Sequence, residues 1–591
     1  MLGWGPRHTD GEANLQKKLV TDPIIDAISL EAPWKLVETF AKMPRWRPKD
    51  VNSSANVIVK MLRDKGVPVT VHKPTVYLSI PFGAEVRTSR RAIKAKPPAY
   101  SRDCREGVEG ELVYVPATYS KSVGTLFAKN QEDESLSAPE RLRGKIVISE
   151  GFAFPGKMLE FEQKGAIGAI AVNPGADVHW GICTSIWGTP DLDDLPRKPG
   201  IPVAAVNNPD GRELIASAKT GGHATIVTNL EEGWYAQNVP MVEIRGQREP
   251  EKFVLVHGHY DSWDMGVGDN ATGDATLLEL ARVFWRHRKS LRRSVRIAWW
   301  PGHSTGRYAG STWYADTFAI DLDENCVAQV NCDSPGCRWA TIFKDVSWTP
   351  ETETYVKSAI KAVTGLDSHG ERPHRAGDYA FNNIGISSFF MLSSTMPDAL
   401  RAERGYYTVG GCGGNIAWHT EHDLIDIADK EILLRDIKVY AQAVIGIANA
   451  EILPFDWRAA TAEFAATVES YQKAAGNAFD MSPARQAIRD LDKALRSFRH
   501  AIQAGKVDAD RGNAVIMGLA RILVPINSTR EARFRHDPAL PIPPLPTLSA
   551  ANDIRAMPKQ LRGFAETQLT RGQNRVVAAM RAAVKLIATA M

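Results

Sequence analysis

A histidine and an aspartate ten residues apart give the first indication of chemistry. In "VHGHYDSWDMGVGDNATG", His259 ends an apolar run and Asp269 stands just before a helical pattern. Imidazole and carboxylate side chains together suit zinc or a related divalent cation. Gly266 and Gly268 allow the loop to fold back, so that both side chains can reach one point. Taken alone, the pair is equally typical of a helix N-cap at Asp269 beside a hydrogen-bonded structural histidine.

Two further groups extend this pattern. Asp333 follows the apolar run "CVAQVN", and His419 stands in "AWHTEHDLID", four residues before Asp423. An acidic neighbour such as Asp423 can orient an imidazole and raise its basicity. Each group alone is more typical of a structural residue. Together, most of them at the ends of predicted strands, they favour a metal site formed by His259, Asp269, Asp333 and His419.

The elements that must position these groups are strands and helices in alternation. Near-continuous apolar runs, typical of strands buried on both faces, occur in "KFVLVHGHYD", "SVRIAWW", "CVAQVNCD" and "ISSFFML". Between them, "ATLLELARVFWRHRKSL" and "ETETYVKSAIKAVTG" have helical spacing. The alternation predicts an α/β sandwich with an open sheet, and functional groups in such folds gather where strands end.

Other parts of the chain have different patterns of apolar residues. Short apolar runs separated by glycine and proline predict a mainly β insert, whereas both ends of the chain show helical patterns. The proline-rich "HDPALPIPPLPTLS" is expected to be an extended loop. We therefore expect an N-terminal part at 1–107, the insert at 108–230, the α/β domain at 231–455 and a helical domain at 456–591.

Composition limits the possible partners. The 591 residues are 44% hydrophobic and 24% charged with a net charge of +4, as in a soluble globular protein. That charge is too small to suggest nucleic acid as the main partner. No apolar run approaches the roughly 20 residues that cross a bilayer, so no membrane partner is expected. The N-terminus has no apolar signal region, and the six scattered cysteines are expected to be reduced thiols in the cytoplasm.

Five motifs carry a resemblance to a known family. "GHYDSW", "DNATG", "AGSTWYAD", "VNCDS" and "WHTEHD" resemble, in sequence and order, the zinc metallopeptidase family of bacterial aminopeptidases, glutamate carboxypeptidase II and the transferrin receptor. The resemblance covers most of the chain. It implies a peptidase-type α/β/α sandwich with a mixed open sheet, a protease-associated insert and a C-terminal helical domain that forms homodimers. It further implies two zinc ions bridged by Asp269, with His259 and Asp333 on one ion and His419 on the other.

The resemblance fails at one loop. The family places two adjacent glutamates there, a general base and a ligand to the second metal, whereas this chain has "GHSTG". Alignment on the preceding strand puts His303 at the base position and Ser304 at the ligand position. Alignment on "GST" shifts them to Ser304 and Thr305. Trp418 also replaces a tyrosine that often helps to stabilise the oxyanion, so the departures cluster around the metal of His419.

Two interpretations follow. The chain is either a non-catalytic binding scaffold, as the transferrin receptor is, or an enzyme with altered chemistry. Because four of five metal-ligand positions are kept, we favour a metal-dependent hydrolase of amide or peptide C–N bonds, a specialised amidase. It would use one or two divalent ions, zinc first, with manganese or iron as alternatives. His303 would serve as the proton shuttle, or as a ligand that rebuilds the two-metal site of a conventional amino- or carboxypeptidase.

The substrate is expected to be a peptide or a small amide, aromatic or carboxylated. Arginines can hold a carboxylate through bidentate hydrogen bonds, although a solvated basic loop is also a common reason for such residues. The candidate substrate-binding residues are Arg307, Tyr308, Arg372, Arg375 and Trp418.

Overall fold

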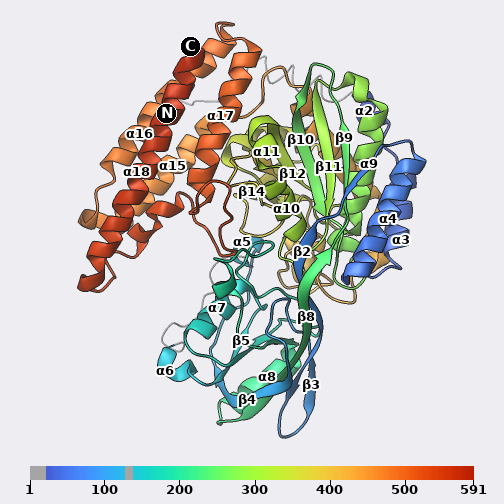
Figure 1. The fold of residues 1–591 in the computed structure, drawn as a ribbon, viewed down its shortest axis with the longest axis vertical. Helices are drawn as coiled ribbons and strands as arrows, with labels where there is room; N and C mark the ends of the chain where they lie inside the picture. Colours follow the sequence, from blue (N-terminus) through green and yellow to red (C-terminus); the bar gives the residue numbers. More distant parts are fainter. Residues whose placement is uncertain (1–21, 127–137) are drawn as a thin grey trace.

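The computed structural model describes residues 22–126 and 138–591, which form three parts (Figure 1). A central α/β domain carries a mainly β insert at one end and a bundle of long helices along one side. The N-terminal segment that lacks an apolar signal region lies outside the described residues. Within the described ranges, no helix is both long and apolar enough to span a membrane.

The central sheet has six strands and is mixed, as predicted. The strands β11, β10, β12 and β15 run parallel to one another, and β9 is antiparallel both to β11 and to the edge strand β1. In spatial order the strands are β1 (Thr70–His72), β9 (Val239–Ile244), β11 (Arg293–Trp300), β10 (Glu249–His259), β12 (Cys326–Asn331) and β15 (Ser388–Phe389). A separate parallel pair, β13 (Phe343–Ser347) and β14 (Ser368–Glu371), was not predicted.

The apolar runs of this sheet reflect burial on both faces. Along β10, Val254 and Val256 belong to one hydrophobic core, and Phe253 and Leu255 belong to another on the opposite face. Both sets are fully buried, so the strands show no polar alternation. Nine helices of the described chain flank or extend this sheet: α2 (Pro23–Asp26), α3 (Glu31–Phe40), α4 (Pro48–Asp64), α9 (Thr272–Arg286), α10 (Ala309–Thr317), α11 (Ala319–Asn325), α12 (Glu353–Thr364), α13 (Asp398–Glu403) and α14 (Lys430–Ala448). The short turn η4 (Pro350–Thr352) precedes α12.

The insert contains a seven-stranded sheet. Its strands, in spatial order, are β3 (Ala92–Ala95), β2 (Thr75–Arg87), β8 (His223–Ala236), β4 (Cys104–Tyr114), β5 (Ile146–Glu150), β6 (Gly168–Val172) and β7 (Val203–Val206). Its helices are α5 (Val123–Leu126), α6 (Pro139–Leu142), α7 (Pro155–Gln163), η1 (Leu195–Arg197) and α8 (Asn208–Ala218). Because β2 pairs with β8 along its whole length, we propose 75–236 as the extent of the insert, in place of 108–230.

The C-terminal part is helical. It consists of α15 (Trp457–Ala475), η7 (Gly476–Ala478), α16 (Ser482–Gln503), α17 (Ala509–Ser528), η8 (Pro546–Asn552) and α18 (Lys559–Ala590). The proline-rich segment is irregular up to Leu545, as expected, but its last residues begin the short helix η8.

Candidate metal centre

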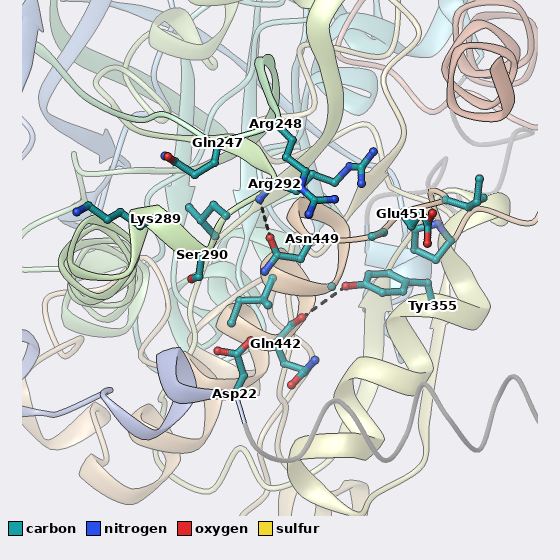
Figure 2. A pocket seen from close by; sticks show the side chains of 16 residues that line it. Asp22, Gln247, Arg248, Lys289, Ser290, Arg292, Tyr355, Gln442, Asn449 and Glu451 are labelled. Atoms are coloured by element: carbon teal, nitrogen blue, oxygen red, sulfur yellow. Dashed lines mark hydrogen bonds between the residues drawn. The ribbon is translucent and has the colours of Figure 1, made fainter. Parts of the chain in front are cut away.

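The two ends of the central sheet differ in chemistry. Where β10 and β11 begin, a cavity of about 880 Å³ is lined by Arg248, Arg292, Tyr355 and Asn449 among others (Figure 2). Its described lining contains no histidine or cysteine, and Arg292 is already paired with Glu249 at 2.8 Å. In open α/β sheets, ligands bind at the carboxyl ends of the strands. The opposite end is therefore the candidate for chemistry.

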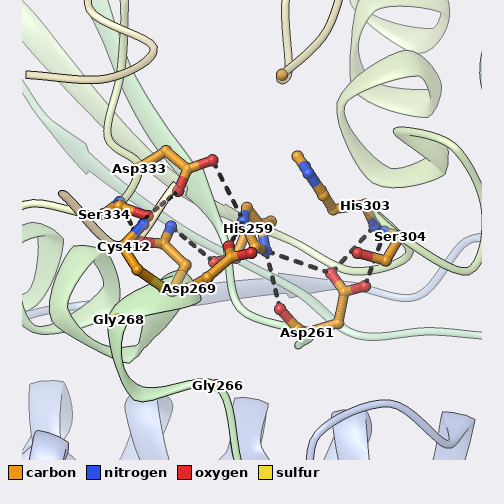
Figure 3. Close-up of polar contacts among 12 residues, drawn as sticks. His259, Asp261, Gly266, Gly268, Asp269, His303, Ser304, Asp333, Ser334 and Cys412 are labelled. Carbon is orange, nitrogen blue, oxygen red and sulfur yellow. Dashed lines mark hydrogen bonds and ion pairs between the residues drawn. The ribbon is translucent and has the colours of Figure 1, made fainter. Parts of the chain in front are cut away.

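Three of the predicted metal ligands, His259, Asp269 and Asp333, meet at those carboxyl ends (Figure 3), and His419 lies beside Asp269. His259 is the last residue of β10, and Asp333 follows the end of β12 by two residues. Asp269 lies in the turn η2 (Val267–Ala271), directly before α9. His419 arrives from an irregular loop that follows the short turn η5 (Cys412–Gly414).

The distances place Asp269 between the two histidines. Its Oδ1 lies 3.1 Å from His259 Nε2, and its Oδ2 lies 3.1 Å from His419 Nε2. Asp333 Oδ2 lies 3.5 Å from the same His259 nitrogen. A carboxylate with one oxygen directed at each histidine is suited to bridging two neighbouring cation positions.

Electrostatics favours a positive charge at this cluster. Burial alone would raise the pKa of Asp269, but the imidazoles of His259 and His419 hold that pKa well below its usual value. Burial alone would lower the pKa of His259, but the carboxylates of Asp269 and Asp333 raise it well above its usual value. Nitrogen and carboxylate oxygen are ligands that zinc and related cations accept. The residues present therefore fit a divalent cation.

The loop that carries Asp269 is held from two sides. Asp423 accepts hydrogen bonds from the backbone N–H groups of Gly268 at 2.7 Å and Asp269 at 2.9 Å, and burial raises the pKa of Asp423 to about 7. From the other side, the fully buried Arg45 donates to the carbonyls of Met265 at 2.7 Å and Gly266 at 2.8 Å. The contacts of Asp423 thus position the ligand Asp269, and His419 is oriented by another group.

That group belongs to the insert. His419 Nδ1 lies 3.0 Å from the carbonyl oxygen of Trp180, and the Trp180 N–H donates to the His419 carbonyl at 2.9 Å. The indole of Trp418 stacks on the His419 ring with centroids 3.7 Å apart. A carbonyl that accepts from Nδ1–H leaves Nε2 free to face Asp269 and a cation.

The "GHSTG" loop is fixed by Asp261, which the sequence analysis left without a role. The Asp261 carboxylate accepts from the backbone N–H groups of His303 at 3.0 Å and Ser304 at 3.3 Å. Its backbone carbonyl lies 2.8 Å from His259 Nδ1. One residue therefore orients the metal ligand and anchors the altered loop. Its place two residues after His259 is the local signal that could have revealed it.

His303 is held as part of a polar pair. Its Nδ1 lies 2.8 Å from the carboxylate of Asp378, which is fully buried and also accepts from the Ser311 hydroxyl. The His303 ring stacks on His259 with centroids 3.8 Å apart. One ligand atom from each of His303, His259 and Asp333 lies within 4.8 Å of the others. His303 is thus close enough to the cluster to transfer a proton or to bind a metal.

The two candidates for the position of the second family glutamate, Ser304 and Thr305, are both buried and contribute no carboxylate. The described side chains at the second cation position are therefore His419 and one oxygen of Asp269. The half of the site around His259, Asp269 and Asp333 has the fuller set of ligands.

A narrow cavity of about 50 Å³ opens onto the cluster. Asp269, His303, Asp333 and His419 contribute to its lining, and Phe152, Phe154, Trp180 and Ile182 of the insert form another part. The insert thus covers the candidate site with mostly apolar side chains. Three predicted substrate-binding residues, Arg307, Tyr308 and Trp418, also line this cavity.

The other two predicted arginines lie elsewhere. Arg372 pairs with Glu463 at 3.1 Å and donates to the Asn527 carbonyl at 2.9 Å. Arg375 donates to the carbonyls of Asp537 and Pro538 and packs 3.6 Å from the centre of the Trp187 ring. Neither lines the metal cavity. The C-terminal part already engages both guanidinium groups, so their observed contacts are structural.

Sequence reasoning missed the groups that support the site from a distance. Asp378 lies 75 positions from His303, and Trp180 lies 239 positions from His419. Asp378 does stand in the loop "ERPHRAGDYAFNNIG", where only the arginines drew attention. Trp180 acts through its backbone, and Arg45 is one of 72 basic residues of the chain. No local pattern marks either one.

A mixed α/β sheet with a buried histidine and aspartate cluster at its carboxyl edge defines a metallohydrolase-type architecture. Comparison with known families is consistent with this class. Residues 239–444 match Peptidase family M28, and residues 108–214 match the PA domain. The central domain is thus similar to Peptidase family M28 and the insert to the PA domain, which confirms the resemblance seen in the motifs.

The curated relatives are similar over parts of their length. A probable glutamate carboxypeptidase from Zea mays is 24% identical over 262 residues, which are 42% of this chain and 36% of that protein. A probable leucine aminopeptidase 2 from Arthroderma benhamiae is 28% identical over 224 residues, 37% of this chain and 42% of that protein. The chain thus spans less than half the length of each.

Solved structures show a shared fold. The zinc aminopeptidase from Bacillus subtilis superposes with a TM-score of 0.52 at 18% identity, covering 72% of this chain and 96% of that one. The aminopeptidase from Aneurinibacillus sp. strain AM-1 gives a TM-score of 0.51, also at 18% identity, with 72% and 95% covered.

Proposed function

We propose that this chain is a metal-dependent hydrolase of an amide or peptide C–N bond in which the pair His303–Asp378 replaces the glutamate base. The observation that carries the proposal is the position of His303. Its ring lies on the ligand His259, and its Nδ1 faces a fully buried carboxylate at 2.8 Å. The family match supports the peptidase-like reaction class.

His259, Asp269 and Asp333 would hold the cation, with His419 beside a second position. Zinc is our first expectation because histidine and aspartate ligands suit it, with manganese or iron as alternatives. A bound divalent ion supplies Lewis acidity, which polarises a carbonyl and lowers the pKa of water. Because "GHSTG" contains no carboxylate in place of the family's ligand glutamate, we expect one tightly held ion per chain.

The roles of His303 and Asp378 follow from their hydrogen bond. Asp378 accepts from Nδ1–H, which fixes the tautomer of His303 and leaves its Nε2 unprotonated. That nitrogen can take a proton from the attacking water and deliver it to the leaving nitrogen. General acid–base catalysis of this kind contributes about 10²–10⁴-fold to a rate. The mostly apolar wall of the insert excludes bulk water from the cavity.

The test combines metal analysis with two neighbouring substitutions. Elemental analysis of protein purified without added metal or chelator gives ions per chain, with Asp269→Asn as the metal-deficient reference. A panel of peptides, N-acyl amino acids and simple amides then identifies turnover. We expect His303→Ala to lower kcat/KM by about 10²–10⁴-fold with metal content retained. The control Ser304→Ala, in the same loop, should stay within a few-fold of the parent.

Other results point to the alternatives. Loss of metal in His303→Ala would make His303 a ligand and favour a rebuilt two-metal peptidase. A chain that binds no zinc, manganese or iron and turns over no amide would be a binding scaffold. Unchanged activity in Asp269→Asn would overturn the site assignment itself.

We also propose a homodimer that uses the C-terminal helices. Leu561 and Phe564 of α18 expose 47% and 74% of their surface, which is unusual for large apolar side chains and supports a contact there. Sedimentation equilibrium gives the mass directly, and a monomer at micromolar concentration would contradict the proposal.

The six unpaired thiols support our placement of the protein in the cytoplasm.

A further inference from the structure

We propose that Arg307 binds a carboxylate of the substrate, so that the preferred substrate is a small amide with a free carboxylate within a few bonds of the scissile C–N bond. The reaction itself rests on the proposed function. The recognition of a carboxylate does not, because it can be measured by binding alone.

Arg307 is a buried cation without a counter-ion. Its side chain is only 7% exposed, and its Nε is buried without a hydrogen-bond partner. Among residues 22–126 and 138–591, the guanidinium has no ion-pair or hydrogen-bond partner, and it lies 4.9 Å from the centre of the Tyr308 ring. Guanidinium stays protonated in proteins, and burying a charge without a partner is unfavourable. Such a group is poised for an anionic ligand.

Neighbouring arginines show what a structural arginine looks like in this region. Arg375 uses its guanidinium on two backbone carbonyls and an indole ring. Arg372 pairs with Glu463. Arg372 Nε is also buried without a partner, but the other nitrogens of Arg372 and both Nε and Nη2 of Arg375 have protein acceptors, whereas the guanidinium of Arg307 has none among the described residues.

The position of Arg307 connects two cavities. It lines the narrow metal cavity and also a neighbouring cavity of about 400 Å³, and Phe154 is shared between them in the same way. The walls of the second cavity come from all three parts of the molecule, including Lys157, Arg375 and Leu540. Glu160 also lines it, but this carboxylate pairs with Lys164 at 2.6 Å. The ligand must therefore bring its own negative charge to Arg307.

The distance to the reacting groups sets the size of the substrate. Arg307 precedes Tyr308, whose ring packs edge-on against His303 with centroids 4.8 Å apart. The Tyr308 N–H donates to the His303 carbonyl at 3.0 Å. One layer of side chains thus separates the guanidinium from the proposed proton carrier. A carboxylate held by Arg307 would place an amide a few bonds away beside His303 and Asp333. An N-acyl amino acid or a dipeptide has these dimensions.

The test compares two probes that differ only in charge. Isothermal titration calorimetry of the full chain with N-benzoylglycine and with its neutral amide measures the contribution of the carboxylate. We expect the acid to bind at least about tenfold more tightly than the amide, as a buried charge-assisted bidentate contact implies. Arg307→Met should remove that preference without weakening the binding of the amide, and Arg307→Lys should retain part of it. Arg102→Met, an exposed arginine of the insert, is the control.

The outcomes separate this inference from the proposed function. Equal affinity for both probes, no binding of the acid at millimolar concentration, or a preference that persists in Arg307→Met would each overturn the inference. If Arg307→Met does not fold, the wild-type comparison and Arg307→Lys still decide. A retained preference for the acid in a protein that hydrolyses no amide would refute the reaction but leave the carboxylate site standing.

Discussion

At the scale of single residues, the proposed function replaces a carboxylate base with the imidazole of His303, which needs a partner. An unpaired imidazole can carry its proton on either nitrogen, so its usefulness depends on what fixes the tautomer. Asp378 meets this need because it is fully buried and contacts Nδ1 of His303. Burial alone would raise the pKa of Asp378, but His303 and the Ser311 hydroxyl keep that pKa below its usual value. The carboxylate therefore remains charged beside the ring.

Replacing Asp378 by asparagine tests this positioning role. We expect Asp378→Asn to lower kcat/KM by about 10–100-fold, because an amide no longer enforces the Nδ1–H tautomer, while metal content stays unchanged. The ¹⁵N chemical shifts of the His303 ring should show mixed tautomers, which a merely structural role would not produce. The control is Asp316→Asn, because the carboxylate of Asp316 contacts His536 at the surface, away from the site. Parent-like activity together with a single tautomer would contradict the role.

At the scale of elements, the site depends on how the loop between β10 and α9 is held. Arg45 reaches this loop from the segment after α3 and donates to backbone carbonyls that include Tyr260, at 2.9 Å. The side chain is completely buried, and burial lowers the pKa of its guanidinium. Hydrogen bonds from a charged donor to buried carbonyls are among the stronger ones in proteins. The loop is therefore positioned before any cation binds.

Replacement of Arg45 should strongly destabilise the fold. We expect Arg45→Met to lower the free energy of unfolding by about 3 kcal/mol or more, because several buried carbonyls lose their donor at once. Urea denaturation measures the change. Arg47→Met, an exposed arginine two residues away, should stay within about 0.5 kcal/mol of the parent. A loss below about 1 kcal/mol for Arg45→Met would show that the loop is held mainly by other contacts.

At the scale of the whole molecule, the insert both lines the cavity of the site and contacts one of its histidines. Trp180 orients the candidate ligand His419, and the adjacent His179 contacts the Trp418 carbonyl at 2.6 Å and the Tyr407 hydroxyl at 2.7 Å. Burial lowers the pKa of His179 to about 3, so this histidine is neutral at physiological pH. The C-terminal part is attached by arginines such as Arg521, which donates to the carbonyls of Leu322 and Cys326 among others.

If His419 holds a cation as proposed, metal retention should depend on the insert. We expect His179→Leu to weaken metal binding or activity by about 10–100-fold, because His419 loses the contacts that align its loop. Competition with a chromophoric chelator measures the affinity. His422→Leu, an exposed histidine near the same loop, should behave like the parent. Unchanged metal affinity and activity in His179→Leu would mean that the insert covers the site without positioning it.

The amino-acid sequence by itself indicated the candidate metal ligands and the elements that carry them. Apolar runs without polar alternation identified strands such as β10 and β12, and polar residues at their ends identified His259 and Asp333. These signals are local, since burial on both faces and chain reversal act over a few residues. For the same reason the loss of the glutamate pair was visible without a structure.

Only the tertiary structure decided what surrounds those ligands. The partners of His303 and His419 lie far away in the chain, and β2 joins the insert by pairing with β8 more than a hundred residues later. Arg307, Arg372 and Arg375 look alike in sequence. Among the described residues, however, Arg372 has a counter-ion and Arg375 has accepting carbonyls, whereas Arg307 has neither. Whether a charge is satisfied depends on which distant groups the fold brings beside it, and no local pattern encodes that.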